Sequence, residues 1–220
     1  MNQVNYQKEL EKILNTLQEK GEAASDYRPP RLFLHSCCAP CSSYCLEYLC
    51  RYFLITVFYY NPNISFSEEY RKRVAEQKRL IAAYNKEEKG WPIDIVEGDY
   101  EPERFYEMAK GYENCPEGGE RCFRCFDLRL RRTAELAAGG GYDYFATTLT
   151  ISPLKNAAKI NEIGQILSGE YGIPWLPSDF KKKNGYKRSI ELSAEYELYR
   201  QNYCGCAFSK AEREAQITNA

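Results

Sequence analysis

Apolar residues follow two different spacings along this chain, and the spacing changes at regular intervals. From Leu10 to Leu17, apolar side chains recur three or four positions apart, which predicts an amphipathic helix over residues 5–21. The glycine- and proline-containing stretch GEAASDYRPP then ends this pattern. The sequence therefore predicts a leader helix and a linker, which together occupy residues 1–29.

Short apolar runs, each followed by a stretch with helical character, make up most of the remaining chain. Four buried strands are predicted at residues 31–36, 54–64, 92–98 and 142–150, and a last extended segment at 173–180. We expect helices between them, one of which runs from Ser67, its predicted N-cap, to Lys89. Strands that alternate with helices predict an α/β fold with a parallel sheet. Such sheets place functional sites beyond the carboxyl ends of their strands.

The composition narrows the class of protein. A chain of 220 residues, of which 44% are hydrophobic, is large enough for one domain with a sizeable core. Its net charge of −1 gives no overall basic field, so any nucleic-acid binding depends on local patches. The N-terminus lacks the pattern of a secretory signal, and no apolar run reaches the roughly 20 residues of a membrane span. We therefore expect a soluble, cytoplasmic protein with no membrane partner.

Ten cysteines and a single histidine define the candidate chemistry. In a reducing cytosol, so many cysteines are expected to be metal ligands or redox groups rather than structural disulfides. The histidine, His35, ends the first predicted strand and is interpreted as a structural residue. Three groups of candidates stand out: Cys37, Cys38 and Cys41; Cys122 and Cys125 with Asp127; and Cys204 with Cys206.

Four of these thiols form the predicted metal site. Cys122 and Cys125 make a CxxC pair where a helix begins, and the free N–H groups of a helix start stabilise thiolate charge. Cys37 and Cys38 occupy a strand-to-helix turn, from which both can reach one centre. Two plus two thiolates make the usual ligand set of a [4Fe–4S] cluster. Zinc bound by four cysteines is the alternative, which the spacing leaves open.

Two further residues adjoin these pairs. Cys41 lies one helical turn beyond Cys38 and could serve a second metal centre or contact the substrate. Asp127 follows Cys125 by two positions, where it could cap the helix, bind a metal or supply a proton for catalysis.

The other cysteines divide into a redox candidate and packing candidates. Cys204 and Cys206 are separated by one glycine, and such a pair can close a strained disulfide of the labile, redox-active kind. Passive thiols are the alternative for this pair. Cys45 and Cys50 fall within the first predicted helix of the α/β unit and are expected to pack in the core.

Two runs of basic residues suggest phosphate contacts, although an ordinary solvated surface is the commoner explanation of such runs. Tyr59 and Tyr60, at the end of the second predicted strand, could stack on an extruded base. The two runs comprise Arg121, Arg124, Arg129, Arg131 and Arg132, and Lys181, Lys182, Lys183, Lys187 and Arg188.

Four segments together resemble one known family. LFLHSCCAPCSSYCLEYL, ERCFRCFDLRL, YFATTLTISPLKN and the late YCGC look like the corresponding segments of the QueH-type epoxyqueuosine reductases, in the same order. The resemblance covers about residues 30–210, which we read as one iron–sulfur reductase domain. Residues 1–29 then form an extension, and residues 211–220 a polar tail.

The resemblance implies both a fold and a site. The fold would be a parallel-sheet α/β/α sandwich related to the adenine nucleotide α-hydrolase-like folds, with a cysteine-rich site at the carboxyl ends of the strands. Cys204 and Cys206 match the redox-active disulfide proposed for the family. The implied cofactors are a [4Fe–4S] cluster on Cys37, Cys38, Cys122 and Cys125 and an adjacent mononuclear iron, with Cys41 and Asp127 as candidate ligands of that iron.

The implied reaction is the reduction of epoxyqueuosine to queuosine in tRNA, the last step of queuosine biosynthesis. Its partners would be the modified tRNA and an electron donor that the sequence does not identify. A cluster-dependent tRNA sulfur transferase is one alternative, but it should carry an ATP-binding loop where this chain has Cys37-Cys38. A zinc-stabilised RNA-binding module is the other, and metal analysis distinguishes it from a brown iron–sulfur protein.

Overall fold

The computed structural model describes residues 4–23 and 26–218 of the chain. Parts of the predicted leader at 1–29 (residues 1–3 and 24–25) and of the predicted tail at 211–220 (residues 219–220) lie outside the described residues. Within the described part, no helix has the length and apolar character needed to cross a lipid bilayer.

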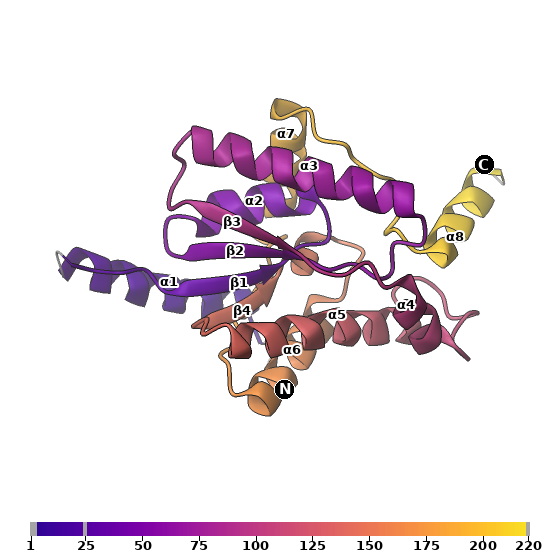
Figure 1. The fold of residues 1–220 in the computed structure, drawn as a ribbon, viewed down its shortest axis with the longest axis horizontal. Coiled ribbons are helices and arrows are strands. Elements are labelled where there is room, and N and C mark those ends of the chain that lie inside the picture. Colours follow the sequence, from indigo (N-terminus) through magenta and orange to yellow (C-terminus); the bar gives the residue numbers. More distant parts are fainter. Residues whose placement is uncertain (1–3, 24–25, 219–220) are drawn as a thin grey trace.

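A four-stranded, all-parallel sheet forms the centre of the molecule (Figure 1). Its strands lie in the order β3-β2-β1-β4, and Phe33 of β1 is in register with Thr56 of β2 and Phe145 of β4. Trp175 makes an isolated parallel bridge to Phe145, so the predicted last extended segment continues the sheet beyond β4. The strands are β1 (Arg31–His35), β2 (Leu54–Tyr59), β3 (Ile93–Glu97) and β4 (Tyr144–Thr147).

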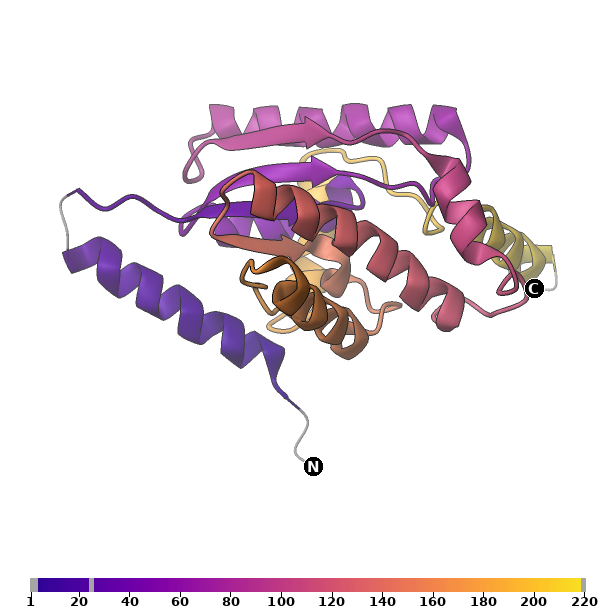
Figure 2. The ribbon, with the colours of Figure 1, turned by 60° about the horizontal axis from the view of Figure 1, so that its bottom comes forward.

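Helices cover both faces of this sheet and give three layers (Figures 1 and 2). One face carries α2 (Ala39–Leu49), α3 (Ser67–Lys86) and α7 (Gly185–Glu195), and the other carries α5 (Glu120–Gly139) and α6 (Ala157–Tyr171). Beyond the carboxyl ends of the strands lie α4 (Pro102–Ala109) and α8 (Ala207–Thr218), while the 3-10 helix η1 (Thr148–Ile151) directly follows β4. The predicted parallel α/β architecture is therefore confirmed.

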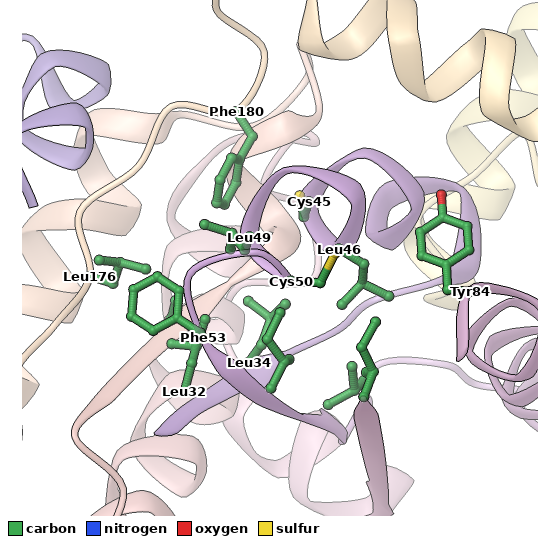
Figure 3. Packing of buried hydrophobic residues seen from close by; sticks show 14 of the residues in the cluster. Leu32, Leu34, Cys45, Leu46, Leu49, Cys50, Phe53, Tyr84, Leu176 and Phe180 are labelled. Carbon is green, nitrogen blue, oxygen red and sulfur yellow. The ribbon is translucent and has the colours of Figure 1, made fainter. Parts of the chain in front are cut away.

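Alternating side chains of the strands build two separate hydrophobic cores. Leu32 and Leu34 of β1 pack with α2 on one face, where Cys45 and Cys50 are fully buried among them (Figure 3). Phe33 points to the opposite face and packs against α5 and α6. Each fully buried leucine or phenylalanine stabilises the fold by about 1.5–3 kcal/mol. The core positions of Cys45 and Cys50 confirm the interpretation of these two residues as packing groups.

The helix predicted near the N-terminus is α1 (Tyr6–Ala23). Its buried side chains Leu10, Leu14 and Leu17 lie on one face and belong to the same core as Leu32 and Phe53. The apolar stripe of α1 thus contributes to the core of the sheet domain. The domain boundary after residue 29 stays a prediction.

The start of α3 differs from the prediction by one residue. Ser67 is the first helical residue, and Phe66 occupies the N-cap position with an extended backbone and no side-chain cap. The predicted capping role of Ser67 is therefore wrong. Instead, Glu68 and Glu69 place negative charge in the first turn, where it favours the helix dipole.

Candidate metal and redox site

Three thiols converge directly after β1. Cys37 and Cys38 form the turn between β1 and α2, and Cys41 extends from the first turn of α2. The Sγ atoms of all three lie within 4.8 Å of one another, and those of Cys37 and Cys38 are 3.9 Å apart. Cys38 takes the N-cap position of α2 with an extended backbone, so the positive end of the helix dipole faces this group. The three thiols could therefore bind a metal.

A buried polar network holds this turn in place. Ser36 Oγ and Ser42 Oγ both donate to Gln77 Oε1 of α3, at 2.8 Å and 2.9 Å. Asn61 Nδ2, from the loop after β2, donates to the carbonyl of Ser36 at 2.8 Å. The turn is thus fixed by side chains from two neighbouring elements before any metal binds. Such support lowers the cost of organising a ligand sphere.

His35 ties the ends of three strands together. Its Nε2 lies 3.0 Å from the carbonyl oxygen of Tyr60, and its Nδ1 lies 2.8 Å from Thr147 Oγ1. Complete burial lowers the pKa of His35 to about 3, so the ring is neutral and donates one hydrogen bond while accepting the other. The interpretation of His35 as a structural residue is confirmed.

A second pair of thiols lies at the start of α5. Cys122 and Cys125 extend from the first two turns of this helix, and the backbone N–H of Gly118 donates to Cys122 Sγ at 3.3 Å. Cys125 is buried and packs with Cys206 and Phe105 of α4. The predicted placement of the CxxC pair at a helix start is confirmed.

The Cys204-Gly205-Cys206 turn requires its glycine. Gly205 has a φ of +121°, and a Cβ at this position would lie 2.9 Å from Ile64 Cγ1 and 3.2 Å from Arg73 Nη1. The carbonyl of Gly205 accepts a hydrogen bond from the N–H of Ser65 at 3.1 Å. This turn is therefore held against the loop that follows β2.

All ten cysteines are free thiols in this structure. The side chain of Cys206, together with the cations of Lys155 and Arg129, lowers the pKa of Cys204 well below its usual value, although burial opposes this shift. Cys204 is thus the thiolate of the pair and Cys206 the thiol, which is a common arrangement for thiol–disulfide exchange. The Cys204–Cys206 disulfide itself stays a prediction.

Three cations surround these thiols. Arg129 is 2% exposed, and its Nε and Nη1 donate to the carbonyl of Cys125 at 3.1 Å and to Asn61 Oδ1 at 3.3 Å. Arg73 is equally buried and pairs with Glu69 at 2.7 Å, but its Nη2 has no hydrogen-bond partner within the described residues. Lys155 follows η1 in the chain and lines the same region.

Burial alone would lower the pKa of both Arg129 and Lys155. The nearby thiols overcome this effect and raise both values: Cys125 first for Arg129, and Cys37 first for Lys155. Within the described residues, neither cation has a carboxylate in ion-pair contact, and the nearby thiols with lowered pKa values are those of Cys37 and Cys204. A buried arginine and a half-buried lysine without carboxylate partners fit a site for thiolates or for an anionic metal–thiolate group.

Two adjoining cavities connect the three groups of cysteines. Cys37, Cys38 and Cys41 line the first cavity, Cys122, Cys125 and Cys206 line the second, and Cys204 lines both. The residues common to both walls also include Glu117, Arg129, Leu154 and Lys155. The structure therefore gathers seven cysteines at the carboxyl ends of the strands, where the fold class predicts a site.

Not every predicted ligand lies in one tight group. Among the described residues, only Cys37, Cys38 and Cys41 meet within 4.8 Å, so Cys122 and Cys125 lie outside this triad. The pair instead forms the wall of the second cavity. The four-cysteine ligand set predicted from the sequence stays a prediction, and the arrangement adds Cys41 as a close neighbour.

Asp127 lies apart from these thiols. Successive residues of a helix are rotated by about 100°, so Asp127 and Cys125 point in nearly opposite directions from α5. The Asp127 side chain is 41% exposed, pairs with Arg131 at 3.3 Å and lines neither cavity. Its predicted metal-binding or catalytic role stays a prediction that this position does not support.

Several features predicted to contact RNA have structural roles instead. Tyr59 and Tyr60 are 0% and 1% exposed, so neither offers a free face to a base. Arg121 is also buried, and its guanidinium pairs with Glu212 and donates to backbone carbonyls. Most other members of the two basic runs pair with carboxylates: Arg124 with Glu120, Arg131 with Asp127, Arg132 with Glu135, Lys181 with Asp179, Lys183 with Glu11, and Arg188 with Glu47.

Sequence reasoning missed Arg73, Glu117 and Lys155, although each lines the first cavity. The spacing of Glu69 and Arg73 on a helix is the only local signal of an ion pair among them. Glu117 lies in a loop and is the only carboxylate among the described residues that line the two cavities. No local pattern in the sequence predicts this position.

The fold and the site define a parallel α/β protein with a thiol-rich, cation-lined cavity at the carboxyl ends of its strands. A family model described as "Epoxyqueuosine reductase QueH" matches residues 32–212. The chain belongs to the QueH family of epoxyqueuosine reductases.

Named relatives from several bacteria support this assignment. The epoxyqueuosine reductase QueH of Staphylococcus epidermidis is 44% identical over 208 residues, which cover 94% of this chain and 84% of the relative. The Staphylococcus aureus protein of the same name is 41% identical, over 96% of this chain and 85% of its own length. That of Thermotoga maritima is 36% identical, over 83% and 91%.

Proposed function

We propose that this chain reduces epoxyqueuosine to queuosine in tRNA, as the last step of queuosine biosynthesis in the cytoplasm. Membership of the QueH family supports the reaction, and the gathering of seven cysteines around two adjoining cavities is the observation that carries the site. Residues 30–210 hold every one of these cysteines, which agrees with a single reductase domain.

The proposed cofactor is a [4Fe–4S] cluster held by Cys37, Cys38, Cys122 and Cys125. The residues fit such a group: the donors are soft thiols from the two cavity walls, and Arg129 supplies buried positive charge with no carboxylate in ion-pair contact among the described residues. When bound, the cluster would supply one-electron transfer. An adjacent iron would take Cys41 as a ligand.

The balanced reaction indicates a role for the C-terminal pair. Conversion of the epoxide to the alkene breaks two C–O bonds, takes up two electrons and two protons, and releases water. Oxidation of the Cys204 thiolate and the Cys206 thiol to a disulfide supplies two electrons and one proton, so the second proton must come from another group. An external reductant must then return the disulfide to two thiols before the next turnover.

One side chain at the shared wall of the cavities can deliver the second proton. Burial, followed by the charge of Cys204, raises the pKa of Glu117, so its carboxyl group holds a proton at a higher pH than usual. Glu117 Oε2 also accepts a hydrogen bond from Ser209 Oγ at 3.2 Å, which orients it. We assign protonation of the departing oxygen to Glu117, with Lys155 as the neighbouring cation that stabilises the oxyanion.

The decisive experiment is anaerobic incubation of the purified chain with a reductant and epoxyqueuosine-containing tRNA, followed by mass analysis of the nucleosides. We expect queuosine to accumulate, and the protein to contain four irons and four sulfides for the cluster, with one more iron where the adjacent site is filled. A colourless protein with one zinc per chain and no product would contradict the proposal. That result would support the zinc-stabilised RNA-binding module instead.

A further inference from the structure

The first cavity concentrates positive charge in a chain that is nearly neutral overall. Its lining includes one carboxylate and five basic residues, in a protein with a net charge of −1. The carboxylate is Glu117, and the basic residues are Arg73, Arg129, Lys155, Arg200 and Arg213. Of the first three, Arg73 pairs with Glu69 at 2.7 Å, and Arg129 and Lys155 lie beside the thiols of the site, which raise the pKa of both cations.

Arg200 and Arg213 differ from these three cations because neither Glu69 nor a thiol of the site balances their charge. Arg200 is exposed, and its Nη1 donates to Ser193 Oγ of α7 at 2.9 Å. Arg213 extends from α8, and its Nη1 donates to Gln216 Oε1 at 2.9 Å. Within residues 4–23 and 26–218, neither guanidinium has a carboxylate in ion-pair contact. Both are held in place, and both have free donors.

The chain between α7 and α8 supplies groups suited to a nucleotide. Gln201, Asn202 and Tyr203 line the cavity between Arg200 and the Cys204 turn, and Tyr186 of α7 lines it as well. The Oε1 atom of Gln201 is buried without a hydrogen-bond partner in the described structure. A buried acceptor without a partner is costly unless a ligand donates to it. Amides and tyrosines are the groups that read and stack on unpaired bases of RNA.

We propose that Arg200 and Arg213 bind backbone phosphates of the RNA strand that carries the modified nucleotide. The inference rests on the proposed function, since it names the part of this chain that holds the tRNA substrate. The two guanidinium groups line the cavity, where they would bind the strand and orient one base toward Cys204. Guanidinium groups form strong, charge-assisted hydrogen bonds with phosphate oxygens. Most members of the two basic runs seen in the sequence pair with carboxylates and are expected to contribute less.

The test measures tRNA affinity and steady-state kinetics for Arg200→Ala and Arg213→Ala. We expect each variant to weaken tRNA binding and to raise KM on the order of tenfold, with kcat changed less than about twofold. The logarithmic salt dependence of binding should become shallower by about 0.7 for each phosphate contact that is lost. Arg200→Lys keeps the charge and should retain most of the affinity.

Arg132→Ala is the matched control, because Arg132 is a half-buried arginine that pairs with Glu135 away from the cavity. It should leave affinity and salt dependence unchanged. Unchanged affinity and salt dependence in the Arg200 and Arg213 variants, with intact iron content and melting temperature, would overturn the inference. Failure of the proposed function looks different: the wild-type chain would then yield no queuosine, whatever its affinity for tRNA.

Discussion

The two walls of the site are built in different ways. Cys37, Cys38 and Cys41 come from one short stretch of chain at the end of β1, where the sheet and the first turn of α2 fix their positions. The opposite wall is assembled from the start of α5 and from the turn before α8, which are about 80 residues apart in the chain. The first wall depends on local structure, whereas the second depends on tertiary contacts.

A small apolar cluster and a few polar contacts assemble the second wall. Arg121 at the start of α5 pairs with Glu212 of α8 at 3.1 Å, and Ser209 of α8 donates to Glu117 at 3.2 Å. Because this apolar cluster is far smaller than either main core, the second wall is expected to open more readily than the first. The comparison indicates a rigid ligand turn opposite a wall that can adjust to metal and substrate.

The largest expected effect comes from the rigid wall. Cys37→Ala or Cys38→Ala should abolish both iron binding and reduction, because each removes a thiol from the only triad that meets within 4.8 Å among the described residues. Iron analysis and the product assay measure this loss. Cys45→Ala is the control: Cys45 is buried in the core, so the variant should lose about 1 kcal/mol of stability but keep its iron. Retention of full iron content in Cys37→Ala would refute the assignment.

The second wall gives the next largest effect. We expect Cys122→Ala or Cys125→Ala to remove the absorbance of the cluster, because the proposed ligand set needs a thiolate pair from each wall. Cys115→Ala, in the loop before α5, should keep the colour. A variant that lacks Cys122 but still binds four irons would show that Cys37, Cys38 and Cys41 hold the metal without Cys122.

Changes at the C-terminal turn should separate metal binding from turnover. Cys204→Ser is expected to keep the iron content but to stop multiple turnover, because the dithiol can no longer be oxidised and reduced. Gly205→Ala should displace the pair, since a φ of +121° strains any other residue by about 1–3 kcal/mol. Rapid-quench and steady-state product assays distinguish these effects. Normal turnover in Cys204→Ser would show that Cys204 and Cys206 have no redox role in the reaction.

The smallest effect is expected at Glu117, where the two walls meet. Its raised pKa means that the carboxyl group donates a proton at low pH and loses this ability as the pH rises through the raised value. Glu117→Gln should lower kcat by about 100-fold and remove this loss of rate from the pH profile. Iron content and tRNA affinity should stay unchanged. If the rate of the variant still falls with rising pH as it does in the wild type, the proton comes from another group.

The sequence by itself determined the elements of the fold and the chemistry available to the site. Short apolar runs are sufficient to predict the four strands, and leucines three or four positions apart predict α1, which is buried on one face. It also placed Cys37 and Cys38 at the end of β1, since a strand followed by a helix defines that turn. The kinds of donor, ten thiols and one histidine, follow from composition alone.

Only the tertiary structure decided which of these groups meet. Arg129 and Arg131 are two residues apart on α5, yet Arg129 is buried beside the thiols while Arg131 pairs with Asp127 outside. Cys41 joins the metal triad, whereas Cys45, one turn further along α2, lies in the core. The partner of a charge or a thiol is set by which distant segments pack against it. A basic run in the sequence therefore cannot tell a phosphate contact from a surface ion pair.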